Sequence, residues 1–183
     1  MVKITRLALA ASMLVMTACS APPRERFYTL DAPEPPAAAE APYSIAVGPV
    51  SVPELVDRPQ LVVRVRANEV VLTEQERWAE PLRGAITRVV AANLATALGA
   101  RVVGQRNGDA DYRVTLDVQR FESGEDALIE AGWTVVPRTG ERRSGHSIAR
   151  VKPQRREYDA LAAAHSAALA AISKEIAAAI CKP

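Results

Sequence analysis

Few side chains in this sequence are suited to catalysis or metal binding. Two cysteines and two histidines among 183 residues leave little material for a metal site. His165 falls on an apolar stripe with helical spacing and His146 in a loop or at a strand edge, and neither setting favours a catalytic histidine. Neither Ser-Gly pair has the flanking pattern of a nucleophile elbow, and the chain has no glycine-rich phosphate loop. The sequence therefore predicts a protein that is not an enzyme and has no metal or other cofactor.

Cys19 is the exception, because its position predicts covalent modification. Two basic residues precede an unbroken run of apolar and small residues at 7–16, and Met16-Thr17-Ala18 leads directly to the cysteine. This order is typical of a signal peptide with a small-residue cleavage site. The apolar run is shorter than the roughly 20 residues needed to span a bilayer. The cysteine resembles the last residue of a bacterial lipobox, although an ordinary secretory signal with a coincidental cysteine is the alternative interpretation.

We therefore expect residues 1–18 to form a signal peptide and Cys19 to carry covalent acyl (palmitate) and diacylglycerol groups. Acyl chains contribute about 0.8 kcal/mol per buried methylene, so several chains together anchor a protein firmly to a membrane. Ser20 follows the cysteine, and by resemblance to lipoproteins of Gram-negative bacteria this favours the outer membrane, with the chain facing the periplasm. Lipidation leaves Cys181 as a free thiol or as half of an intermolecular bridge.

Residues 19–42 have the composition of a tether. Asp31 to Pro42 consists only of proline, alanine and acidic residues, which cannot form a core and favour an extended spacer of up to roughly 35 Å. The formal net charge of +2 and the 4% aromatic content give no support to nucleic-acid binding. The sequence thus predicts a lipidated cysteine and tether at 19–42, followed by one folded domain at 43–183.

The domain pattern predicts strands in its middle and two main helices. Apolar residues recur at helical spacing from Pro81 to Gly99 and again from about Arg155. Thr73 to Glu76 fits a capping box and is interpreted as a turn before the first helix. Alternating apolar and polar residues predict strands at 43–48, 61–67, 70–72, 100–103, 112–119, 127–135 and 146–151, with a turn at Asn107-Gly108. These elements indicate an α+β single domain with a largely antiparallel sheet and two main helices packed on one face.

Five segments of the sequence, taken in their order along the chain, resemble those of a known protein family. They are Phe27-Tyr28-Thr29-Leu30, Val47-Gly48-Pro49-Val50, the stretch 56–64 with Asp57-Arg58-Pro59-Gln60, the stretch 77–82 with Trp78-Ala79-Glu80-Pro81-Leu82, and the stretch 111–121. Together they resemble the PqiC-like auxiliary lipoproteins of ABC-type transport. The resemblance covers nearly all of the chain after Cys19, although the basic segment 138–156 matches nothing in it.

The resemblance implies a non-enzymatic lipoprotein subunit of an MCE/ABC-type lipid transport system across the Gram-negative envelope. Such a subunit docks on a periplasm-spanning MCE-domain protein, contacts outer-membrane lipid, assembles into a homo-oligomeric ring and supports membrane integrity. The leading alternative is a structural lipoprotein of outer-membrane assembly with no link to lipid transport, and a periplasmic hydrolase ranks third. A neighbouring gene for an MCE-domain protein would favour the lipid transport role over the other two.

Two groups of residues are hypothesised to bind the partner. One is an extended aromatic segment that offers a strand for pairing, and the other is a set of polar residues on and before an early strand. The six residues are Phe27, Tyr28, Asp57, Arg58, Gln60 and Arg64. A local ion pair within the second group is the alternative interpretation. The basic residues of 138–156 fit either lipid phosphates and an acidic partner or an ordinary solvated loop.

Overall fold

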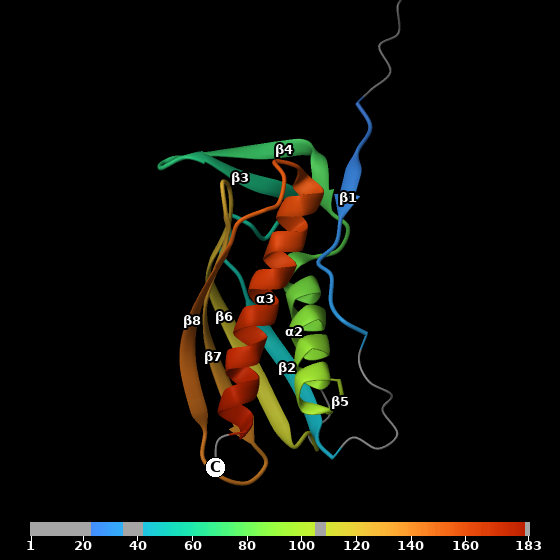
Figure 1. Ribbon diagram of the computed structural model, residues 1–183, viewed down its shortest axis with the longest axis vertical. Helices are drawn as coiled ribbons and strands as arrows, with labels where there is room; N and C mark the ends of the chain where they lie inside the picture. Colours follow the sequence, from blue (N-terminus) through green and yellow to red (C-terminus); the bar gives the residue numbers. More distant parts are fainter. Residues whose placement is uncertain (1–22, 35–41, 105–108, 182–183) are drawn as a thin grey trace, which may run out of the picture.

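The computed structural model describes residues 23–34, 42–104 and 109–181 (Figure 1). The segment predicted as a signal peptide at 1–18, Cys19 and the turn at Asn107-Gly108 lie outside the described residues, as do residues 20–22 and 35–41 of the segment 19–42. The statements below concern the described ranges.

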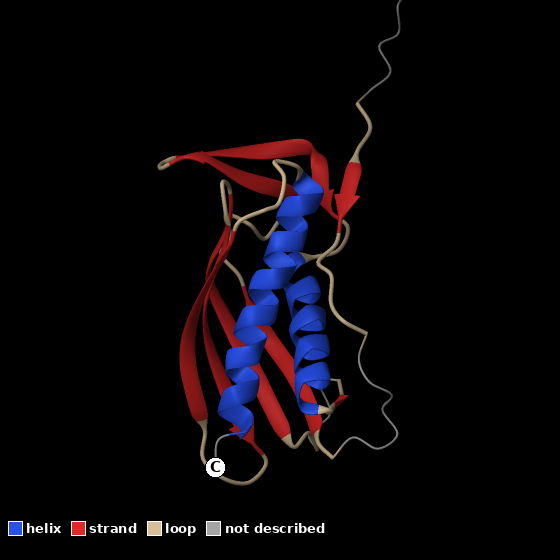
Figure 2. Ribbon diagram, viewed as in Figure 1, coloured by secondary structure: helices blue, strands red, loops and turns tan. Residues whose placement is uncertain are grey.

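The described strands form one sheet of eight strands, part of which lies behind the two helices while a hairpin crosses the upper end (Figure 2). The strands are β1 (Arg26–Tyr28), β2 (Ser44–Ser51), β3 (Gln60–Arg66), β4 (Glu69–Trp78), β5 (Arg101–Val102), β6 (Tyr112–Ser123), β7 (Ala127–Pro137) and β8 (Arg143–Val151). β7 pairs with β6 along its whole length, and β8 follows on β7. The opposite edge of β6 pairs with β2 near its start and with β3 at Ser123, so the sheet divides into two branches there. β5 extends the first branch, and β4 and β1 extend the second.

The α+β class and the two helices are confirmed, but the expectation of a largely antiparallel sheet is wrong. Four of the seven described strand pairings are parallel: β1 with β4, β2 with β5, β2 with β6 and β3 with β6. The other three pairings are antiparallel. The error has a physical cause. A strand with one buried face shows the same alternation of apolar and polar residues whether its neighbour runs parallel or antiparallel to it. Both main partners of β6 on its branched edge lie far earlier in the sequence, beyond the reach of local turn signals.

Both helices pack on one face of the sheet (Figures 1 and 2). The helix α2 (Leu82–Leu98) begins after Pro81 and ends at Gly99, whose φ of 59° is a left-handed conformation that glycine adopts without strain. The helix α3 (Tyr158–Cys181) lies beside α2 and contacts β7 and β8. By length and composition α3 is the one described helix apolar enough to cross a membrane, yet half of its most apolar window is buried inside the fold.

The N-terminal segment is part of this fold. β1 pairs in parallel with the end of β4, from Arg26 opposite Glu76 to Tyr28 opposite Trp78. Leu30 is only 1% exposed and belongs to the hydrophobic core, and the backbone N–H of Asp31 donates to Ser166 Oγ on α3 (2.9 Å). The segment interpreted from the sequence as a tether thus supplies a strand and a core residue to the folded unit.

Candidate partner-binding site

Three segments that are far apart in the sequence meet at the end of β4. Arg77 of β4 stands opposite Phe27 of β1 on one side and opposite Gln60 of β3 on the other. The backbone N–H of Trp78 donates to the carbonyl of Pro59 (2.7 Å), and that of Ala79 donates to the carbonyl of Tyr28 (2.9 Å). These bonds hold the chain before β3, the chain after β4 and the end of β1 against one another.

A cavity of about 310 Å³ opens where the two loops meet. The loop before β3 and the loop between β4 and α2 line it, with Asp57, Arg58, Pro59, Trp78, Ala79, Glu80, Pro81 and Leu82. Trp78 and Leu82 are buried, whereas Asp57, Arg58 and Pro59 are exposed. Trp78 belongs to the hydrophobic core, and its indole packs edge-on against Phe121. The cavity therefore combines an apolar floor with a polar rim, an arrangement typical of binding sites.

Ion pairs fix most of the charges on this rim. Asp57 accepts a hydrogen bond from Arg83 near the start of α2 (2.6 Å), and Glu80 accepts one from Arg88 one turn further on (2.5 Å). Arg88 also donates to the carbonyl of Leu30 (2.9 Å), which ties the N-terminal segment to the same helix. Within the described part of the chain, Arg58 forms no ion pair. Its exposed guanidinium is the rim charge that is left to meet a partner.

The two aromatic residues of β1 differ in their surroundings. Phe27 is 59% exposed. Tyr28 is half-buried, donates its hydroxyl hydrogen to Glu76 and lies 6.1 Å from the ring of Tyr158 on α3. Burial, followed by the hydrogen bond to Glu76, raises the pKa of the Tyr28 hydroxyl. The strand that these two residues belong to, β1, was predicted to be available for pairing, and one of its edges is already paired with β4 in this structure.

Arg64 lies apart from the other five hypothesised residues. It stands further along β3, where its guanidinium is 3.3 Å from Glu122 on β6 and donates to the carbonyl of Ala67 (2.8 Å). A hydrogen bond from Arg120, together with the charges of Arg120 and Arg64, holds the pKa of Glu122 below its usual range. Among the described residues, the charged side chains Asp57 and Arg64 of this group pair outside it, Asp57 with Arg83 and Arg64 with Glu122. The structure therefore brings five of the six residues together.

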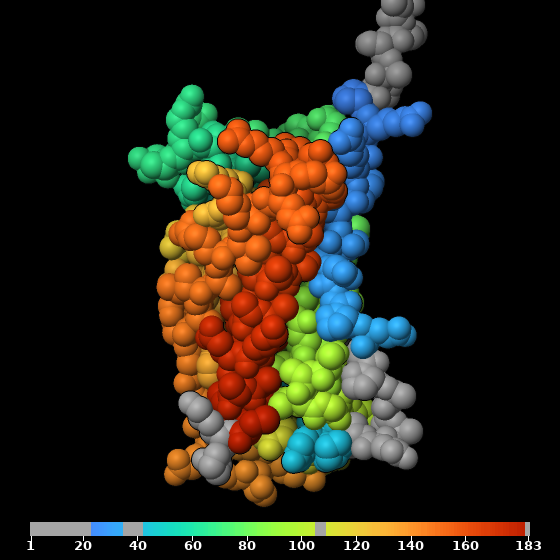
Figure 3. All heavy atoms as spheres, in the orientation of Figure 1, coloured from blue at the N-terminus to red at the C-terminus, as the bar shows by residue number. Residues whose placement is uncertain are grey.

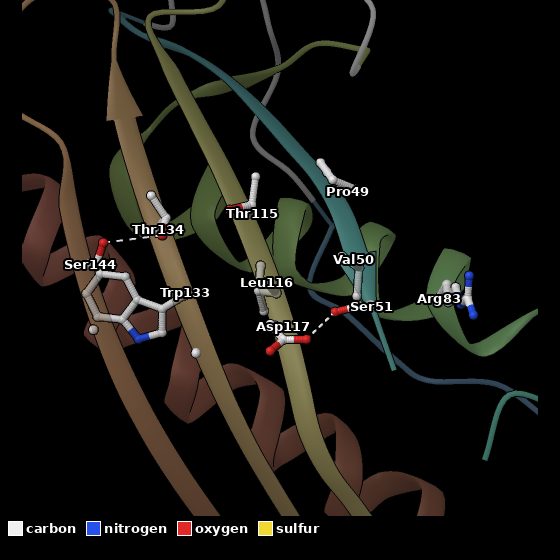
Figure 4. Close-up of a pocket in the computed structure, with 12 residues that line it drawn as sticks. Pro49, Val50, Ser51, Arg83, Thr115, Leu116, Asp117, Trp133, Thr134 and Ser144 are labelled. Atoms are coloured by element: carbon white, nitrogen blue, oxygen red, sulfur yellow. Dashed lines mark hydrogen bonds between the residues drawn. The ribbon is translucent and has the colours of Figure 1, made fainter. Parts of the chain in front are cut away.

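A second, larger cavity of about 670 Å³ lies on the sheet surface formed by β2, β6, β7 and β8 (Figure 4). Thr115, Thr134 and Ser144 stand side by side on three neighbouring strands of its wall. Ser51 donates its hydroxyl hydrogen to Asp117. Among its lining residues there is neither a histidine nor a cysteine, and the carboxylate of Asp117 is already hydrogen-bonded. The described lining of this surface thus combines hydroxyl groups with one carboxylate and the guanidinium of Arg83.

The histidines occupy structural positions. His165 is fully buried, its Nε2 lies 2.8 Å from Ser123 Oγ, and its ring stacks on Phe121 at 4.0 Å. His146 is exposed on β8, with Nε2 at 3.1 Å from Glu130. In the described ranges, no group of three or more histidine, cysteine, aspartate or glutamate side chains is placed to hold a metal ion.

Sequence reasoning missed that Trp78, Pro81 and Leu82 would line the same cavity as Asp57 and Arg58. These residues belong to one of the two most specific segments of the resemblance, so the resemblance was the available signal. Their spacing alone gives no reason to place them beside Asp57, because the pairing of β3 with β4 brings the two loops together.

Comparison with known proteins identifies the family to which a chain with this fold belongs. Residues 28–177 match the family model of the ABC-type transport auxiliary lipoprotein component. The chain belongs to this family. It is therefore a member of a class of lipoproteins that serve as auxiliary components of ABC-type transport systems.

Solved structures share the fold. A crystal structure of an uncharacterized protein is 21% identical, with a TM-score of 0.74 over 86% of this chain and 99% of that chain. A protein from Xanthomonas campestris is also 21% identical, with a TM-score of 0.67 over 83% of this chain and 92% of that chain. A search of curated proteins finds no match. At these identities the likeness concerns the fold.

Proposed function

We propose that this chain is a non-enzymatic lipoprotein subunit of an MCE/ABC-type lipid transport system of the Gram-negative envelope. In this proposal acyl groups on Cys19 attach it to the outer membrane, where it faces the periplasm. It docks on a periplasm-spanning MCE-domain protein, and the assembly supports membrane integrity. The family match supports the auxiliary role, and the lipobox-like sequence supports the anchor.

The observation that carries the docking role is the meeting, at one cavity, of two segments that carry the resemblance. Asp57, Arg58 and Pro59 before β3 and Trp78-Ala79-Glu80-Pro81-Leu82 at the end of β4 and after it line the same 310 Å³ space. Binding energy at protein interfaces concentrates where a few tryptophan, tyrosine and arginine side chains surround a pocket that excludes water. Arg58 at the rim and Trp78 in the wall fit this description.

The test is a pull-down of the lipidated chain from detergent-solubilised envelopes, with co-purifying proteins identified by mass spectrometry. The informative variant is Arg58→Ala, because this side chain has no ion pair with a described residue whose loss would disturb the fold. Arg142→Ala is the matched control, since Arg142 is equally exposed and lies in the distant connection between β7 and β8. Removing a rim arginine at an interface commonly weakens binding by about 1–2 kcal/mol, roughly tenfold.

The expected result is an MCE-domain protein in stoichiometric amount, reduced by Arg58→Ala and unchanged by Arg142→Ala. Recovery of only outer-membrane assembly factors would refute the transport role and leave the structural lipoprotein as the explanation. Equal loss with both variants would refute this cavity as the docking site.

A further inference from the structure

One end of the molecule exposes apolar side chains that no described residue covers. Nine large hydrophobic side chains are exposed among the described residues, and four of them lie on β1 and on the hairpin of β3 and β4. They are Phe27, Val65, Val71 and Leu72. Figures 1 and 3 show this hairpin crossing the upper end and standing out from the body. Exposed apolar groups gathered on a projecting element are typical of a contact surface.

Both faces of the hairpin carry these residues. Val63 stands opposite Val71, and Val65 lies further along β3, where the register with β4 shifts between Arg64 and Arg66. Leu72 stands opposite Val62 on the other face. At the tip the guanidinium of Arg66 pairs with Glu69, and both side chains are exposed. The outer part of the hairpin therefore carries exposed apolar side chains on both of its faces and a pair of charged side chains at its tip.

The N-terminal segment fixes which end of the molecule lies next to an anchor at Cys19. Seven residue steps separate Cys19 from Arg26, and even a fully extended chain spans at most about 25 Å over that length. From Arg26 onward the chain is held by β4, by the hydrogen bond of Tyr28 to Glu76 and by the burial of Leu30. The Pro/Ala-rich residues follow β1, so they do not lengthen the connection to Cys19.

The opposite end of the molecule, at the end of α3, lies too far from Cys19 to be the end that an anchor holds at the membrane. α3 begins beside β1, where the rings of Tyr158 and Tyr28 lie 6.1 Å apart, and its 24 residues extend about 36 Å away from there. The guanidinium of Arg143 donates to the carbonyl of Ile180 at the far end of this helix (3.1 Å). A tether of at most about 25 Å is shorter than this helix, so the β1 end is the one that the anchor draws to the bilayer.

We propose that the end formed by β1 and the β3–β4 hairpin rests on the lipid bilayer, with Phe27, Val65, Val71 and Leu72 contacting the boundary between headgroups and acyl chains. This inference rests on the acylation of Cys19 in the proposed function. Short apolar side chains and an aromatic ring enter this boundary, while neighbouring arginines remain among the phosphates. Because Arg66 is offset by Glu69 and Arg77 by Glu25, apolar contact is the main attraction.

The test uses the full mature chain, acylated and reconstituted in vesicles of phosphatidylethanolamine and phosphatidylglycerol. A single cysteine replaces Leu72 in one variant and Val136 in the other, both in a Cys181→Ser background, and an environment-sensitive fluorophore is attached to it. These two side chains are 42% and 41% exposed, so they form a matched pair. Val136 reports on the far end of the molecule. Its neighbour Val135 stands opposite Arg143, and Arg143 binds the last turn of α3. Emission is recorded with ordinary and with brominated lipids.

The expected result is a blue-shifted emission for Leu72→Cys that brominated lipids quench several-fold more strongly than the emission of Val136→Cys. Equal quenching at the two positions would overturn the proposal. A blue shift without quenching by brominated lipids would also overturn it, since the hairpin would then be covered by protein, such as a second copy of the chain. Mass spectrometry of Cys19 distinguishes failure of the proposed anchor from failure of the proposed membrane contact. An unmodified Cys19 in native material refutes the anchor. If Cys19 is acylated and Leu72→Cys is still not quenched, only the proposed orientation is refuted.

Discussion

The indole of Trp133 occupies the space that a side chain on Gly145 would need. The two residues stand opposite each other on β7 and β8, and Trp133 is buried. Its Nε1–H donates to Ser147 Oγ (2.9 Å), and Ser147 in turn donates to Glu175 on α3. The glycine thus allows a large ring to lie across two strands and link the sheet to the helix.

We expect Gly145→Ala to lower the free energy of unfolding by about 1–3 kcal/mol, as overpacking of a well-filled core does. An added Cβ would lie 2.2 Å from Cζ2 of Trp133, and a rigid ring cannot move aside without disturbing its hydrogen bond. Urea denaturation measures the change. Gly104→Ala is the control, because a Cβ there meets nothing within 4 Å. Equal losses in the two variants would contradict the packing argument.

His165 makes the stability of the fold depend on pH. Burial lowers its pKa from 6.5 to about 3, so the folded chain keeps the ring neutral while the unfolded chain protonates it near pH 6.5. The stabilisation is therefore complete above pH 6.5 and is lost as the pH falls towards 3. Between pH 6.5 and pH 3 we expect His165 to lower the free energy of unfolding by about 1.4 kcal/mol for each unit by which the pH falls.

This contribution is measured as the difference in pH dependence between the parent chain and His165→Phe, which cannot titrate. Ile172→Val is the control, because it changes the buried face of the same helix and neither adds nor removes a titratable group. We expect His165→Phe to flatten the stability profile between pH 6 and pH 4 and Ile172→Val to leave its slope unchanged. Parallel profiles for the parent chain and His165→Phe would show that His165 is not the titrating group.

At the scale of elements, the N-terminal segment contributes to stability in spite of its composition. We expect Leu30→Ala to lower the free energy of unfolding by about 2–5 kcal/mol, because Leu30 is 1% exposed and its truncation leaves a cavity. Thr29→Ala is the control at the exposed neighbouring position. Chemical denaturation of the two variants gives the comparison. A flexible tether up to residue 42 would instead make both substitutions neutral.

Both helices could be predicted from the sequence because their signals are local. Pro81 and Gly99 mark the ends of α2, and the apolar stripe of α3 includes Leu161, His165 and Ile172, all buried as expected. The turn at Asn68 and the start of the next strand were also predictable. The capping-box interpretation of Thr73 to Glu76 is wrong, since β4 continues through it. The hydroxyl of Thr73 lies 3.0 Å from the carbonyl of Leu61, a partner on another strand that local spacing cannot reveal.

Strand partners and the cavity could not be predicted in the same way. β1 pairs with β4, and β2 pairs with β6, across long stretches of intervening chain. Alternation shows that a segment has a buried face, but it does not show which strand lies beside it or in which direction. The polar residues Asp57, Arg58 and Gln60 were recognised by type, whereas Arg64 was grouped with them because it is near in sequence, and its pairing with Glu122 separates it from the site.

At the scale of the whole molecule, the proposed function makes the position of the chain in the cell depend on acylation of Cys19. We expect Cys19→Ser to move the protein from the membrane fraction to the soluble fraction with no change in the thermal unfolding midpoint, because the described fold begins after this residue. Cys181→Ser is the matched control, since Cys181 is an exposed free thiol, and it should stay with the membrane. Fractionation and immunoblotting give the answer. Retention of Cys19→Ser in the membrane fraction would contradict acylation at this position.

The branching of the sheet at β6 also determines the order in which the chain can fold. β6 and β7 are consecutive and form their hairpin from local contacts, whereas β2 has to wait until β6 is available. Pairings between segments far apart in sequence form slowly, because closing the long loop costs entropy before any contact compensates for it. β5 comes before β6 but pairs only with Ser44 and Ile45 of β2. As the chain emerges from a ribosome or a secretion channel, the remaining apolar residues of β2 therefore stay unpaired in the sheet until residue 112 and those after it have followed. This strand is the part of the nascent chain that a chaperone would have to protect from aggregation.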